Sequence, residues 1–91
     1  MTDVEKIADI VRAAYPDIRH QQLRVLHRGA DDDALWFFTR PGVDDEVQIE
    51  SHDGMCPFLV EHHGSPERRT ANTPEAVARI IVEWLAADPA R

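Results

Sequence analysis

Residues 35–60 read LWFFTRPGVDDEVQIESHDGMCPFLV, and this stretch decides the fold. Within it, Glu46–His52 alternates apolar and polar side chains, a pattern typical of an antiparallel strand with one buried face. Leu35–Arg40 and Phe58–His62 are rich in aromatic and branched residues and predict two further strands. Asp53-Gly54 is a favourable two-residue hairpin turn, so we expect a tight connection before the last of these strands.

Two helices are predicted to flank these strands. Thr2 can cap the first helix, with Glu5 at the capping-box spacing, and Pro16 ends that helix. Thr73 followed by Pro74 marks the start of the second helix, because proline is well tolerated at the first helical position. Apolar residues recur at three- and four-residue steps in both segments, so each helix has one face to bury.

The chain of 91 residues has room for a single domain, residues 1–91. A fourth strand is expected at Leu23–Arg28, whereas Gly64–Asn72 is polar and is expected to be irregular. Because the connections are short, consecutive strands should be neighbours. The predicted fold is a two-layer α+β structure: an N-terminal helix, a four-stranded antiparallel meander in the order 1-2-3-4, and a C-terminal helix, with both helices on one sheet face.

The predicted turn also sets a register for the last hairpin. A tight turn at Asp53-Gly54 places Ile49 opposite Phe58 and Val47 opposite Val60. Both apolar pairs then lie on the same side of the sheet, which favours these four residues as its core face.

The register of Leu35–Arg40 depends on the next loop. A five-residue loop at Pro41–Asp45 would pair Phe37 with Ile49, so Phe37 would join the core. The same register sets Arg40 opposite Glu46.

In this register Trp36, Phe38, Arg40 and Leu59 share the uncovered face of the sheet. An apolar patch of that size on a small domain is typical of an interface, so these four residues are the predicted binding surface for a protein partner or a second copy. The alternative is that other parts of the same chain cover Trp36 and Phe38.

A metal site has one candidate location, the hairpin at residues 51–56. His52, Asp53 and Cys56 carry donor atoms that suit zinc. No second Cys/His pair lies at ligand spacing, so the pattern predicts neither a metal site nor a bound cofactor. His62 is expected to cap the core edge, and the acidic run Asp44–Glu46 is expected to be a solubilising turn.

Composition narrows the possible partners. The chain has 17 acidic and 10 basic residues and a net charge of −7, which repels nucleic acid and anionic membrane surfaces. Its single cysteine cannot form an intrachain disulfide, and the composition of residues 1–91 leads us to expect neither a signal peptide nor a membrane-spanning stretch. We therefore expect a cytoplasmic protein.

The sequence contains no recognisable catalytic constellation, so it predicts a protein that is not an enzyme. The favoured hypothesis is a small acidic protein-interaction module, with homodimerisation through the open sheet face as one form of it. One alternative is a ligand- or metal-binding accessory domain centred on residues 51–56. Another is an antagonist of a basic partner, of the kind that immunity proteins represent.

Overall fold

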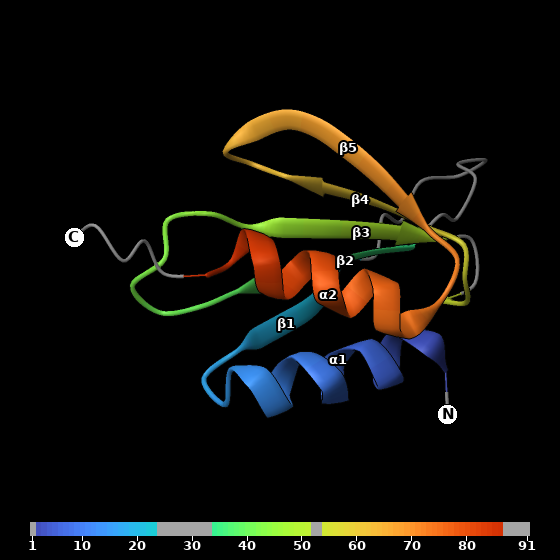
Figure 1. The fold of residues 1–91 in the computed structure, drawn as a ribbon, viewed down its shortest axis with the longest axis horizontal. Helices are drawn as coiled ribbons and strands as arrows, with labels where there is room; N and C mark the ends of the chain where they lie inside the picture. The colour runs from blue at the N-terminus through green and yellow to red at the C-terminus, as the bar shows by residue number, and fades with distance from the viewer. Residues whose placement is uncertain (1, 24–33, 52–53, 87–91) are drawn as a thin grey trace.

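The computed structural model describes residues 2–23, 34–51 and 54–86. Its elements follow the order α1 (Asp3–Ala14), β1 (Arg19–Leu23), β2 (Ala34–Thr39), β3 (Val47–Ser51), β4 (Phe58–His62), β5 (Ser65–Ala71) and α2 (Pro74–Trp84). The strands form one antiparallel sheet in the order β1-β2-β3-β4-β5, and the helices pack against each other (Figure 1). The α+β class and both terminal helices are confirmed, but the sheet has five strands rather than the predicted four.

Both helices begin where the capping signals place them. Thr2 accepts a hydrogen bond from the Glu5 backbone N–H at 3.2 Å, and Thr73 accepts one from Ala76 at 3.1 Å. These bonds satisfy backbone donors that the first helical turn leaves without a partner. The buried stripes of both helices join one face of the sheet in a single core cluster, so we call this side of the sheet the core face.

The additional strand, β5, corrects the prediction that Gly64–Asn72 is irregular. Its sequence, SPERRTA, does not alternate, because β5 lies at the sheet edge and buries only Ala71. Pairing with β4 supplies its structure, from Phe58 opposite Ala71 to Glu61 opposite Arg68. A pattern search for one buried face cannot find such a strand.

The first strand also begins earlier than expected. The sequence predicts Leu23–Arg28, whereas β1 runs from Arg19 to Leu23, and residues 24–28 lie outside the described residues. The polar residues of β1 give no apolar period, and their strand conformation comes from pairing with β2, where Gln21 lies opposite Phe37.

The core face of the last hairpin is confirmed, and its register is not. Val47, Ile49, Phe58 and Val60 are fully buried. Ile49 lies opposite Val60 rather than Phe58, because the connection between β3 and β4 is longer than a two-residue turn. A shift of two residues leaves every side chain on its predicted face.

The register of β2 differs by an odd number of residues, which turns the strand over. Trp36 pairs with Ile49 and Phe38 with Val47, so both rings lie on the core face, where they are 8% and 0% exposed. Phe37 lies on the opposite face, and the prediction that it joins the core is wrong.

The physical reason is the connection between β2 and β3. Phe38 is the last residue of β2 that pairs with β3, so residues 39–46 separate it from Val47, an even number in place of the odd number that the prediction set between Arg40 and Glu46. Within this connection the Val43 N–H donates to the Arg40 carbonyl at 3.2 Å. Gly42 has φ +81°, a conformation that suits glycine. Arg40 therefore does not pair with Glu46 as predicted.

The two faces of β2 give a direct test. We expect Phe38→Ala to lower the free energy of unfolding by about 3–5 kcal/mol, because a fully buried ring leaves a cavity. Phe37→Ala should cost only about 1 kcal/mol, because its ring is partly exposed already. Urea unfolding of both variants measures the difference, and an equal or reversed order would contradict the observed register.

Candidate functional site

Three of the four predicted binding residues are not on the uncovered face. Trp36 and Phe38 pack under the helices, and the Trp36 ring meets Phe58 edge-on, with centroids 6.2 Å apart. The Arg40 guanidinium donates to the Leu85 carbonyl at 2.9 Å, at the end of α2, and lies 3.7 Å from the centre of the Tyr15 ring. The placement of these three residues on the open face is therefore wrong, because β2 is turned over.

Leu59 does lie on the uncovered face, together with Phe37, which the predicted register placed in the core, and with polar side chains of β3. We define the open face as the half-buried side chains that point away from the helices at the positions where β2 pairs with β3 and β3 with β4: Leu35, Phe37, Gln48, Glu50, Leu59 and Glu61.

The open face combines apolar and acidic groups in a regular pattern. Glu50 sits between Leu35 on β2 and Leu59 on β4, which are its cross-strand neighbours. Glu61 lies 3.7 Å from the Arg68 guanidinium at the sheet edge. Glu50 has no ion-pair partner within residues 2–23, 34–51 and 54–86. A cationic group arriving on this face would therefore meet a carboxylate flanked by leucines.

The candidate metal site is only partly described. His52 and Asp53 lie outside the described residues, and within the remainder no three His, Cys, Asp or Glu side chains form a group that could hold a metal ion. Burial, followed by the hydrogen bond and charge of Asp3 and the charge of Glu75, raises the pKa of Cys56 to about 11. Zinc binds the thiolate, so this environment opposes metal binding through Cys56.

The raised pKa predicts that the Cys56 thiol reacts slowly with alkylating reagents at neutral pH. Two pH units above the ordinary value of 9.0 correspond to about 100-fold less thiolate at pH 8. We expect iodoacetamide to alkylate native Cys56 with an apparent pKa near 11, and the urea-unfolded protein to react with one near 9. A native thiol that titrates at or below 9 would contradict this environment.

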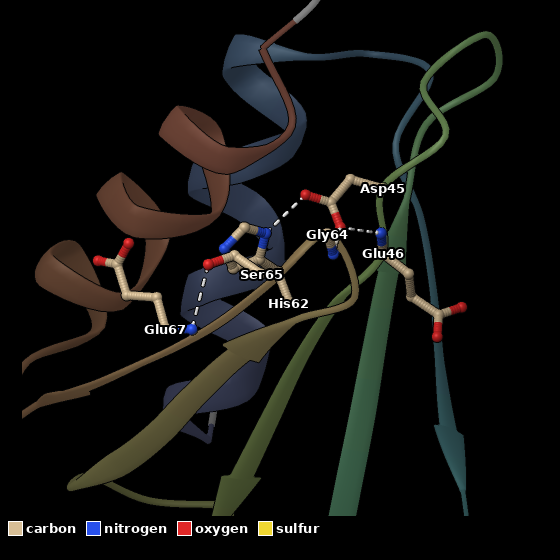
Figure 2. A network of polar contacts seen from close by, with 6 residues as sticks. All are labelled: Asp45, Glu46, His62, Gly64, Ser65 and Glu67. Atoms are coloured by element: carbon tan, nitrogen blue, oxygen red, sulfur yellow. Dashed lines mark hydrogen bonds and ion pairs between the residues drawn. The ribbon is translucent and has the colours of Figure 1, made fainter.

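A polar cluster that the sequence reasoning missed lies at the other end of the sheet (Figure 2). Asp45 Oδ2 is 2.6 Å from His62 Nδ1, and Asp45 Oδ1 accepts the backbone N–H groups of Glu46 at 2.8 Å and Gly64 at 3.0 Å. Asp45 thus ties the β2–β3 connection to the end of β4. The two residues are 17 positions apart, so only the sheet register brings them together.

The ring of His62 is enclosed on its other side. It stacks on Trp84 of α2 with centroids 4.0 Å apart, and its Nε2 is buried without a hydrogen-bond partner among the described residues. An aspartate that orients a histidine is also found in catalytic and metal sites, where the second ring nitrogen faces the reacting group or the ion. Here that nitrogen is buried, which favours a structural role and agrees with the expectation that His62 caps the core edge.

Asp45 should make stability depend on pH. Burial raises its pKa, but hydrogen bonds from His62, Gly64 and Glu46 outweigh burial, and the net pKa lies below the ordinary value of 3.8. A depressed pKa stabilises the fold above pH 3.8, and this stabilisation disappears as the pH falls through the folded-state pKa.

We therefore expect Asp45→Asn to be less stable than the wild type at neutral pH, with a difference that shrinks below pH 3.8. Urea unfolding across this range measures it. Asp44→Asn is the matched control, since Asp44 is exposed and makes no hydrogen bond or ion pair within the described parts of the chain. Equal effects of the two substitutions at all pH values would contradict the role of the cluster.

Comparison with known proteins found no matching family model, no matching curated protein and no matching solved structure. Among the described residues, neither helix has the length and apolar character needed to cross a bilayer.

Proposed function

We propose that the chain is a non-enzymatic interaction module that binds a basic protein partner through the open face. The observation that carries this proposal is the arrangement of Leu35, Phe37 and Leu59 around Glu50 on a sheet face that the helices leave free. The open face replaces the predicted surface around Trp36 and Phe38, whose rings are used in the core.

The apolar side chains of the open face would contribute to the free energy of binding a partner. Aromatic residues often dominate protein interfaces, and Phe37 is the one aromatic side chain among the residues that define the open face. Leu35 and Leu59 flank Glu50 and would exclude water from an ion pair formed there. An ion pair that is shielded from water is strengthened relative to one on an open surface.

The charge of the chain favours a basic partner over a second copy. A net charge of −7 speeds the approach of a cationic surface and opposes the approach of an identical chain. Two copies joined face to face across a two-fold axis would also bring Glu50 and Glu61 of each copy toward like charges. An antagonist of a basic protein, of the immunity type, is one form of this proposal, and a cytoplasmic location belongs with it.

The ligand- or metal-binding domain at residues 51–56 is the weaker candidate. Its thiol has a raised pKa, and its other two candidate ligands lie outside the described residues.

The test places a photo-crosslinking phenylalanine analogue at Phe37 in cells and, as a control, at Ile10, an exposed apolar residue on α1. We expect the Phe37 site alone to trap a partner of basic composition. Leu59→Glu should then weaken the purified complex by at least about tenfold, because it adds a buried charge to the interface. Ile10→Glu should leave affinity unchanged, and both variants should melt near the wild-type temperature.

Three outcomes would contradict the proposal. One is equal loss of affinity in Leu59→Glu and Ile10→Glu. Another is a trapped partner of acidic composition. The third is a sedimentation mass of twice 10.3 kDa for the purified chain that Leu59→Glu reduces to the monomer, which would favour the homodimer.

A further inference from the structure

Among residues 2–23, 34–51 and 54–86, no strand pairs with the outer edge of β1. Strand β1 pairs with β2 on one side, and none of its backbone groups is hydrogen-bonded to any other element of the described chain. Its residues Arg19, His20, Gln21 and Gln22 are all exposed. A strand edge of this kind presents a row of N–H and C=O groups that can pair with an added strand.

The opposite edge is protected. Strand β5 contains Pro66, which has no N–H to offer, and Arg69, which binds Glu67 at 2.6 Å and Glu83 at 3.2 Å. Proline and charged side chains are devices that block pairing at sheet edges. The contrast between the two edges singles out β1.

Two grooves flank β1, one on each face of the sheet. The groove on the helix side has a volume of about 370 Å³, and its walls include Val4 and Glu5 of α1 and the ring of Trp36. The groove on the other side has a volume of about 460 Å³, and its walls include Phe37 and Glu46. His20 and Gln21 line both grooves, so the two meet along β1, the strand nearest α1 in Figure 1.

This geometry matches recognition by strand addition. Successive side chains of a strand point to opposite faces, so an added strand would place alternate side chains in the two grooves. Backbone hydrogen bonds along the edge supply affinity, and the grooves supply specificity.

We propose that the β1 edge receives an extended segment of a partner protein as a sixth strand, with basic and apolar side chains in alternation. Basic side chains enter the helix-side groove, where Trp36 and Val4 contact the aliphatic stem and Glu5 pairs with the charge. Apolar side chains enter the other groove over Phe37, where Glu46 and Arg19 balance each other in charge.

This site is distinct from the open-face proposal, because its helix-side groove lies on the other face of the sheet. The two proposals share Phe37, so the experiments that separate them use Glu5 for the edge and Leu59 for the open face.

The probe is a peptide of about seven residues in which lysine and valine alternate, a length that spans a typical strand. We expect NMR titration of the labelled protein to show saturable shifts at residues 19–22, with backbone contacts between the peptide and β1. Glu5→Gln should weaken binding by about 3- to 10-fold, as for the loss of one interfacial charge pair. Glu75→Gln is the matched control, because Glu75 is also an exposed glutamate in the first turn of a helix, α2. Leu59→Glu should leave the affinity unchanged.

The proposal is overturned if the lysine–valine peptide shows no saturable binding at millimolar concentration. It is equally overturned if a glutamate–valine peptide binds as well, if the shifts centre on β5 or the open face, or if Glu5→Gln and Glu75→Gln weaken binding to the same extent.

Discussion

Which face of β2 packs under the helices determines the rest of the molecule. Trp36 and Phe38 lie opposite Ile49 and Val47, so two aromatic rings of about 150–250 Å² each are removed from water between sheet and helices. A slip of one residue would exchange them for Phe37 and its neighbours and expose both buried rings. The helices could not then pack as they do, because the Trp36 and Phe38 rings belong to the cluster that both helices cover.

Contacts at both ends of the connection between β2 and β3 stabilise the register of β2. Arg40 leaves β2 on the core face and donates to the carbonyl of Leu85, a favourable place for a cation because the end of a helix carries partial negative charge. Asp45, at the other end of the connection, pairs with His62, whose ring stacks on Trp84. Arg40 thus links the β2–β3 connection to the end of α2, and Asp45 links the same connection to the end of β4.

The same packing decides which surfaces remain for partners. With the Trp36 and Phe38 rings inside, the open face carries Phe37 and two leucines set among carboxylates, an arrangement that in our proposal suits a basic protein better than a second acidic chain. The two sheet edges differ as well. Proline and paired charges occupy β5, whereas β1 lies exposed between two grooves. The open face and the β1 edge are therefore the two separate surfaces on which the proposals for partner binding rest.

The amino-acid sequence by itself determined the two helices, their Thr2 and Thr73 caps, the α+β class and the core faces of β3 and β4. Capping and side-chain period are local properties, and an even shift in register leaves them intact. Tertiary structure alone decided the face of β2, because LWFFTR is apolar on both sides and the length of its turn sets the register. The strand conformation of SPERRTA depends on its pairing with β4 in the assembled sheet. The contact between Asp45 and His62 likewise depends on the sheet, because the two residues are distant in the chain.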